Sequence, residues 1–225
     1  MAKIRKFALY ITVVCSFSSV FFNRAYAQDN FYEEQKRLFY GGLLVGANFS
    51  QVDGDYFAGY HRVGINVGGI VYAQLAEHVA LSMEILYSQK GSKSDIVKPV
   101  NVNGTPVFIE KYAISANYAE VPVMINYFDK RKSHFGVGLS YSQLVSSDET
   151  ITTNPVMTPD FTQYPFKKYD LNALAGVQLH LVQGLFLNIR FQYSVLPIRT
   201  ELPPYFARAQ QYNNLWVVRV MYLFK

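Results

Sequence analysis

Residues 184–195 alternate between apolar and mostly polar side chains. The apolar positions are Leu185, Leu187, Ile189, Phe191, Tyr193 and Val195, and the positions between them are Phe186, Asn188, Arg190, Gln192 and Ser194. A period of two places these two sets on opposite faces of one β-strand. The segment therefore predicts a strand with one apolar face and one polar face.

The same pattern recurs along the chain. We expect eight strands, over residues 40–50, 63–75, 79–89, 117–127, 135–145, 171–181, 184–195 and 215–224. Three of the connections between them are short, at residues 76–78, 128–134 and 182–184. The four connections that alternate with these are long, at residues 51–62, 90–116, 146–170 and 196–214. Alternating short turns and long loops are typical of bacterial outer-membrane barrels.

The N-terminus has the three regions of a secretory signal peptide. Lys3, Arg5 and Lys6 precede an apolar run over residues 7–22, and an A-x-A cleavage pattern ends at Ala27. A membrane-anchor helix is the less favoured alternative, because the run is short and contains several serines. The only cysteine, Cys15, lies in this segment. Cleavage after residue 27 would leave a mature chain without disulfides or thiol chemistry.

The charge of the chain argues against nucleic acid as a partner. The whole sequence has 21 Lys and Arg against 16 Asp and Glu, but Lys3, Arg5, Lys6 and Arg24 leave with the signal peptide. The remainder, 17 against 16, is nearly neutral. The basic balance therefore belongs mostly to the signal, and a basic surface for nucleic acid is not indicated.

After the signal, no apolar stretch approaches the ~20 residues of a membrane-spanning helix. The 18 tyrosines and 17 phenylalanines suit strands and interfacial girdles. We therefore predict an all-β fold, an eight-stranded antiparallel transmembrane β-barrel of up-and-down meander topology, in the cell outer membrane. Its expected parts are the signal peptide at residues 1–27, a short periplasmic segment at 28–39 and the barrel at 40–225.

The register can be checked against the thickness of a membrane. The nine residues 79–87, at ~3.3 Å each and tilted by ~40°, span roughly 23 Å, close to the ~25 Å apolar band of such barrels. Aromatic side chains should then mark both rims of that band. The expected outer girdle is Tyr87, Tyr141 and Tyr193, and the expected inner girdle is Tyr127, Phe135 and Phe224.

The same register points charged side chains into the lumen. Glu84, Glu120, Arg190 and Arg219 all fall on the inward face. Eight strands leave room for little more than side chains, and unpaired buried charges cost several kcal/mol each. We expect Glu84 and Glu120 to pair with Arg190 and Arg219 across the lumen and to close it. Packing is the favoured role of this cluster, with an ion path or proton relay as the alternative.

Catalytic and metal sites are weakly indicated. His61 is the only histidine expected near the outer rim, where a lipid-modifying barrel enzyme would need its base. A solvated loop histidine is the simpler interpretation. Asp53 and Asp55 lack the remainder of a calcium loop. We expect no catalytic residues, no cofactor and no metal. Aromatic residues of the long loops could form a binding surface or pack over the barrel mouth, and the sequence favours neither.

Four segments resemble the PorT-like outer-membrane β-barrel family of Bacteroidota, a porin-type family. They are Gly46-Ala-Asn-Phe-Ser50, Leu81-Ser-Met-Glu-Ile-Leu-Tyr-Ser-Gln-Lys-Gly91, Asn117-Tyr-Ala-Glu-Val-Pro-Val-Met-Ile-Asn-Tyr127 and Phe135-Gly-Val-Gly-Leu-Ser-Tyr141. The resemblance covers nearly the whole mature chain and implies an eight-stranded outer-membrane barrel. The founding member of that family is tied to protein secretion, and the family offers no catalytic motif.

These observations predict a non-enzymatic barrel with a structural, adhesive or envelope-assembly role. The alternatives are a narrow channel or porin, a component of a protein secretion system and, less favoured, a lipid-modifying enzyme. A soluble lipocalin-type barrel is disfavoured because the inward residues are polar. The expected partners are outer-membrane lipid, the barrel assembly machinery and envelope proteins that contact the long loops.

Overall fold

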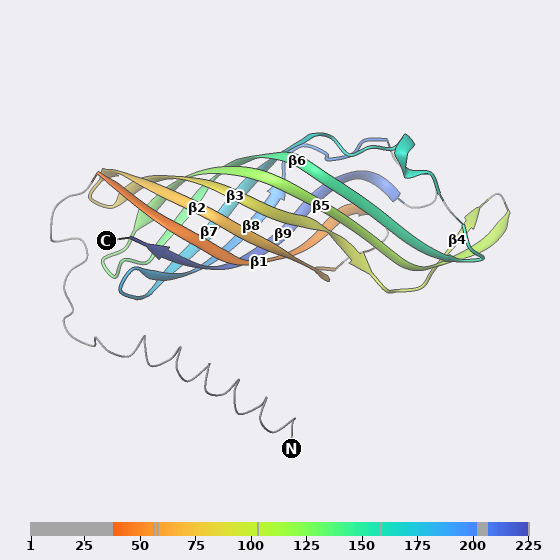
Figure 1. Ribbon diagram of the computed structural model, residues 1–225, viewed down its shortest axis with the longest axis horizontal. Helices are drawn as coiled ribbons and strands as arrows, with labels where there is room; N and C mark the ends of the chain where they lie inside the picture. Colours follow the sequence, from red (N-terminus) through yellow and green to blue (C-terminus); the bar gives the residue numbers. More distant parts are fainter. Residues whose placement is uncertain are drawn as a thin grey trace, which may run out of the picture. The chain divides into compact units, whose positions relative to one another are not determined.

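The computed structural model describes residues 38–55, 57, 59–102, 104–157, 159–201 and 207–224 (Figure 1). The expected signal peptide and most of the expected periplasmic segment lie outside these residues. No helix in the described ranges is long and apolar enough to cross a membrane.

Nine strands make up almost all of the described chain. They are β1 (Phe39–Asp55), β2 (Arg62–Ala76), β3 (Val79–Ser94), β4 (Lys98–Val102), β5 (Thr105–Phe128), β6 (His134–Asn154), β7 (Tyr169–Val182), β8 (Leu185–Ser194) and β9 (Ala207–Leu223), with one 3-10 turn, η1 (Phe161–Gln163).

Eight of these strands close into a ring. Each barrel strand pairs antiparallel with its neighbours in the chain, β3 pairs directly with β5, and β1 pairs with β9 to complete the circle. The short strand β4 lies outside the ring and pairs with β5. The predicted all-β antiparallel meander barrel is therefore confirmed.

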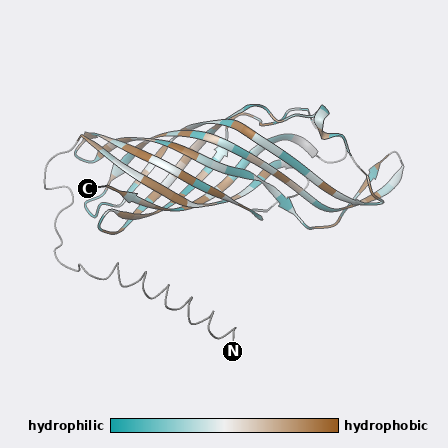
Figure 2. Cartoon of the chain, in the orientation of Figure 1, coloured by the Kyte–Doolittle hydropathy of each residue, from teal (hydrophilic) through white to brown (hydrophobic). Residues whose placement is uncertain are grey.

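The strands alternate as the sequence predicts. On β3, Met83, Ile85 and Tyr87 are exposed on the outer surface, whereas Ser82 and Glu84 are buried inside. Figure 2 shows the alternation as brown and teal patches along the strands. The aromatic residues expected in the two girdles face outward, with Tyr87, Tyr141, Tyr127, Phe135 and Phe224 all exposed. The barrel therefore presents an apolar belt around a polar interior.

Two glycines show how closely the strands approach. A Cβ atom at Gly46 would collide with the backbone oxygen of Val218, and one at Gly68 would collide with that of Ile85. Both glycines point into the barrel, where a small ring curves most sharply. Any larger side chain at these positions would push neighbouring strands apart.

The two ends of the barrel differ. The short-turn end carries the β2–β3, β5–β6 and β7–β8 turns and the last residues of β9, and the long-loop end carries the remaining connections (Figure 1). At the long-loop end, several predicted strand boundaries are wrong. β3 continues to Ser94, β6 continues to Asn154, and the segment 90–116, predicted as a loop, is mostly strand.

Two structural changes explain why the alternation of apolar and polar residues did not predict these strand extensions. The pairing of β5 with β6 is shifted by irregularities at Ile109/Lys111 and at Asn117/Tyr118, each of which interrupts the period of two. Beyond the apolar belt, the inward face also changes from polar to apolar, since Ile109 and Ile114 face inward. A strand that leaves the membrane packs its apolar side inside and presents polar side chains to water.

Candidate functional site: a closed polar lumen

The interior of the barrel holds many buried polar side chains. Glu84 on β3, Glu120 on β5, Arg190 on β8 and Arg219 on β9 each point inward and are 1% exposed. The alternation of each strand places them there, since residues with the same parity share one face. All four residues singled out by the sequence therefore lie in one lumen.

Glu84 accepts hydrogen bonds from both guanidinium groups. Arg190 donates through Nη1 at 3.1 Å and through Nη2, while Arg219 donates through Nη1 at 2.9 Å. Arg219 also donates to Asn188 Oδ1 at 2.9 Å and to Asn66 Oδ1 at 3.1 Å. One carboxylate thus binds two cations, and two amide oxygens accept further hydrogen bonds from Arg219. Charge-assisted bonds of this kind are stronger than neutral ones.

Glu120 forms its ion pair with a residue that the sequence analysis placed in a loop. Its Oε2 lies 3.2 Å from Lys90 Nζ, and Gln192 Nε2 donates to its Oε1 at 2.8 Å. Lys90 Nζ is also 3.4 Å from Asp170 Oδ2 and 4.9 Å from the centre of the Tyr118 ring. Glu120 therefore belongs to a second charge cluster rather than to the pairs with Arg190 and Arg219 that we expected.

A sequence signal for Lys90 does exist. The even-numbered residues of β3 continue the inward series beyond Glu84, and Ser88, Lys90, Ser92 and Ser94 are all buried. With Lys90 included, three cations (Lys90, Arg190 and Arg219) face three carboxylates (Glu84, Glu120 and Asp170) in the two clusters. The charges of these clusters are balanced, as groups removed from water require.

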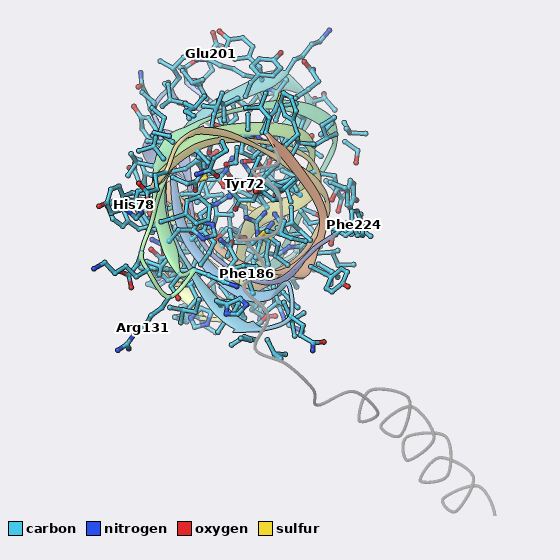
Figure 3. The ribbon with its side chains drawn as sticks, turned by 90° about the vertical axis from the view of Figure 1, so that its left-hand side faces the viewer. Tyr72, His78, Arg131, Phe186, Glu201 and Phe224 are labelled. Atoms are coloured by element: carbon cyan, nitrogen blue, oxygen red, sulfur yellow. The ribbon has the colours of Figure 1, made fainter. Side chains whose placement is uncertain are left out.

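Aromatic side chains fill the lumen at the short-turn end. His134 Nε2 lies 2.9 Å from the Tyr72 hydroxyl, and its ring stacks on Phe128 at 4.1 Å and meets the Phe186 ring at 5.8 Å. Figure 3 views the barrel from this end and shows Tyr72 and Phe186 inside the ring. His134 was expected at the end of the 128–134 connection, but β6 begins at this residue and its side chain is buried.

A hydrophobic core fills the long-loop end. It consists of the buried side chains Val52, Phe57, Ile109, Tyr112, Ile114 and Ile198, against which Val100, Ile151, Phe161 and Phe166 pack. Of the loop aromatics that the sequence left undecided, Phe57, Phe161 and Phe166 thus pack over the barrel mouth. Tyr60 and Phe108 remain exposed.

An ion pair and a titratable carboxyl accompany this core. Arg199 pairs with Glu149, and its guanidinium lies 3.7 Å from the centre of the Phe166 ring. Tyr112 donates its hydroxyl hydrogen to Glu149, and burial raises the pKa of Tyr112 well above its usual value. Burial also raises the pKa of Asp55 to about 7, although the Phe57 N–H and the Ser92 hydroxyl both donate to its carboxylate.

The weak catalytic and metal candidates gain no support from their contacts. His61 is exposed beside β2, while Asp53 accepts hydrogen bonds from Gln51 and Asn214, and Asp55 accepts from Phe57 and Ser92. In the described part of the chain, no three His, Cys, Asp or Glu side chains gather as a metal site would require. The carboxylates near His61 are therefore engaged in local structure.

A family model described as the outer membrane protein beta-barrel domain matches residues 26–198. Among solved structures, the attachment invasion locus protein Ail of Yersinia pestis is 12% identical with a TM-score of 0.44, and the match covers 84% of this chain and 100% of Ail.

Two further barrels are similar. The outer membrane protein AlkL is 13% identical with a TM-score of 0.39, over 88% of this chain and 97% of AlkL. The N-terminal β-barrel domain of Pseudomonas aeruginosa OprF is 10% identical with a TM-score of 0.32, over 81% of this chain and 97% of that domain. No curated protein sequence matches this chain.

Proposed function

Because the chain belongs to the outer membrane protein beta-barrel domain family, we propose that it is a closed outer-membrane barrel with a structural, adhesive or envelope-assembly role. In this proposal the barrel anchors a β-sheet that projects from the membrane, and the sheet contacts other proteins of the envelope. The barrel has no enzymatic role and no cofactor in this account, and its short-turn end faces the periplasm, as is usual for such barrels.

The burial of the lumen residues carries the proposal. Glu84 and Arg219 are 1% exposed and Lys90 is 0% exposed, although all three lie along the axis of the barrel. A water-filled channel leaves its lining side chains accessible to water, as in larger porins. Here the two charge clusters, the His134 aromatic group and the outer hydrophobic core occupy the interior from one end to the other.

The projecting sheet supports contact with proteins. β6 pairs with β7 as far as Gln143, and Leu144 donates to Lys168 O, but β6 continues to Asn154. In the described ranges, residues 146–154 pair with β5 on one side, and their other edge has no strand partner. Open edges bind extended segments of other chains.

The opposite edge of this sheet differs in chemistry. β4 carries Lys98 and Pro99, and both residue types protect an edge from pairing with another strand. Residues 145–154 contain neither Lys nor Pro and are rich in Ser and Thr. Of their two acidic residues, Asp148 and Glu149, the second is paired with Arg199. The edge of β6 is therefore the one suited to a partner strand.

A photo-crosslinking amino acid tests the contact role in cells. Placed at Thr150 or Thr152, on the projecting part of β6, it should form adducts with other envelope proteins. Placed at Val137 or Leu139, on the apolar belt of the same strand, it should contact lipid and form no protein adducts beyond those made with the assembly machinery. Equal protein adducts from both pairs of positions would argue against a docking role for the sheet.

A narrow channel is the second candidate. Proteoliposomes that contain the protein should not swell in an isosmotic sugar or amino-acid solution, whereas liposomes with an open porin should. Swelling at a rate that depends on solute size would favour the channel.

The resemblance to PorT-like proteins supports a third candidate, a component of a protein secretion system. Loss of secreted proteins from the medium after deletion of the gene, with restoration by the wild-type chain, would favour it. A lipid-modifying enzyme is the least favoured candidate, because His61 would be its rim base. His61→Ala should leave the turnover of outer-membrane lipids unchanged.

A further inference from the structure

Cationic side chains gather on one arc of the short-turn rim. The turn between β5 and β6 carries Lys130, Arg131 and Lys132, and the side chains of Lys130 and Arg131 are exposed. Asp129 is the only acidic residue of this turn, so the turn has a net charge of +2. The β2–β3 turn of the same rim carries an exposed acidic residue, Glu77, and the exposed large apolar side chains of the rim include Leu38, Phe39, Leu75, Val182 and Phe224.

The backbone of the turn is fixed by hydrogen bonds. Asp129 N–H donates to Ser133 O at 2.8 Å, and Lys132 N–H donates to Asp129 O at 3.0 Å. Lys132 adopts a left-handed conformation with a φ of 67°, which reverses the chain sharply. Lys130 and Arg131 therefore extend from the tip of an ordered turn.

The turn adjoins the aromatic girdle. Tyr127 and Phe135 face outward from β5 and β6, and their ring centroids are 5.6 Å apart. The His78 ring packs against Tyr127 at 5.9 Å, and Phe128 N–H donates to His78 O at 2.8 Å. Figure 3 shows His78 and Arg131 outside the ring on the same side of the rim. Aromatic and cationic side chains thus form one outward-facing patch.

The strand geometry puts the patch near the expected depth of the lipid headgroups. Lys130 is three residues beyond Tyr127, which corresponds to roughly 7–8 Å along the membrane normal for a strand tilted by ~40°. The headgroup layer on each side of a bilayer is about 5–7 Å thick. With Tyr127 at the edge of the hydrocarbon, the backbone of Lys130 lies at the outer limit of the headgroup layer, and the long side chains of Lys130 and Arg131 can reach back to the phosphates.

We propose that this turn binds the phosphate headgroup of an anionic phospholipid at the short-turn rim. The Arg131 guanidinium and the Lys130 ammonium contact the phosphate oxygens, and the rings of Tyr127, Phe135 and His78 pack along the glycerol and upper acyl region of the same lipid. Guanidinium binds phosphate in a bidentate manner, whereas ammonium acts as a point charge. Lipid binding at this turn does not depend on whether the lumen conducts.

Spin-labelled lipids test the proposal. The full chain is reconstituted in phosphatidylcholine bilayers with a trace of spin-labelled phosphatidylglycerol or phosphatidylcholine, and electron paramagnetic resonance measures the fraction of label held at the protein surface. One engaged cation should favour phosphatidylglycerol about three- to ten-fold at low salt. The preference should disappear in 1 M salt, where the screening length is about 3 Å.

Two double variants separate this site from general attraction by charge. Lys130→Gln with Arg131→Gln should remove the preference. Lys111→Gln with Lys168→Gln, which removes two exposed lysines toward the long-loop end, should leave it unchanged. Heat-dependent gel mobility verifies that both variants are folded.

Three results would overturn the proposal. They are equal retention of both lipids by the wild type, an unchanged preference after the turn substitutions, and loss of the preference in the control variant. Competition by millimolar inorganic phosphate, at an ionic strength where chloride has no effect, would assign the turn to free phosphate instead of lipid.

Discussion

At the scale of single residues, Glu84 and Asp55 show opposite consequences of burial. Glu84 is held by two guanidinium groups, so its charge is compensated by partners on β8 and β9. Asp55 is buried among the outer strands with a hydroxyl and a backbone N–H as donors and no guanidinium bound to it. Neutralising Glu84 should therefore destabilise the folded barrel, whereas for Asp55 it is ionisation that should destabilise it.

Glu84→Gln should strongly destabilise the barrel. The substitution leaves Arg190 and Arg219 buried without their shared carboxylate, and breaking a buried pair in this way costs about 3–5 kcal/mol. Urea unfolding in lipid vesicles, followed through the fluorescence of the only tryptophan, Trp216, measures the loss. Glu77→Gln, in the exposed β2–β3 turn, is the matched control and should change the free energy of unfolding by less than about 0.5 kcal/mol.

Asp55 should make the outer half of the barrel more stable in mild acid. Its pKa is about 7 in the folded chain and about 4 when unfolded, so the folded state binds the additional proton between these values. The protonated Asp55 carboxyl therefore contributes its full stabilisation below about pH 4. This contribution falls as the pH rises from about 4 to about 7 and remains low above that range.

Hydrogen exchange of the outer end of β1 at pH 5 and pH 8, corrected for the intrinsic exchange rate, checks this expectation. Asp55→Asn should remove the pH dependence and should protect this segment most at pH 8, where the carboxylate of the wild type is charged beside Asp53. Greater protection of the wild type at pH 8 than at pH 5 would contradict the assigned direction.

At the scale of strands, one part of the barrel depends on close contacts between backbones, and another depends on side-chain packing. Within the apolar belt, inward glycines allow adjacent strands to approach closely. Beyond it, the inward face carries the hydrophobic core around Tyr112 and Ile114. Substitutions in the two regions should therefore differ in what they disrupt.

Gly68→Ala should impair folding far more than Gly69→Ala. A Cβ atom at Gly68 would overlap the backbone oxygen of Ile85, while one at Gly69 would lie 3.7 Å from Gly42 O, an ordinary contact. The fraction of heat-modifiable, folded protein in outer-membrane preparations measures the difference. Similar yields for these adjacent substitutions would show that the strands can separate without cost.

Phe57→Ala should loosen the projecting sheet and leave the membrane barrel folded. The ring is 2% exposed, lies 5.0 Å from the Tyr112 ring, and its removal should cost about 3–5 kcal/mol in that core. Limited proteolysis should then cleave the long-loop end, while heat-modifiable mobility of the protected fragment persists. Phe108→Ala, at a side chain 46% exposed on β5, should leave the protease resistance unchanged.

Whether a strand could be predicted from the sequence depends on the environments of its two faces. The strand at residues 185–194 was predictable because lipid on one side and a polar lumen on the other impose a strict alternation. The outer parts of β5 and β6 were not, because irregular pairing shifts the phase and the apolar side turns inward. Lys90 keeps the phase of β3, but it was missed because that strand was expected to end at Gln89. The ion pair between Lys90 and Glu120 depends on distances across the barrel, and a local sequence pattern contains no information about those distances.

At the scale of the whole molecule, the barrel interior is a sequence of layers. The His134 aromatic group, the Glu84 cluster, the Lys90 cluster and the outer hydrophobic core follow one another along the axis. Each layer is held by its own side-chain contacts, so opening a continuous path would require several layers to separate together. In the proposed closed barrel, the polar interior holds the wall of a small barrel together and fills the lumen.

The electrical conductance of single molecules in planar lipid bilayers tests this closure most directly. The wild-type chain, inserted as verified by heat-modifiable mobility of the same preparation, should give no discrete current steps in 1 M KCl at moderate voltage. Reproducible steps of uniform size at low voltage would show a continuous aqueous path through the lumen and would contradict the account.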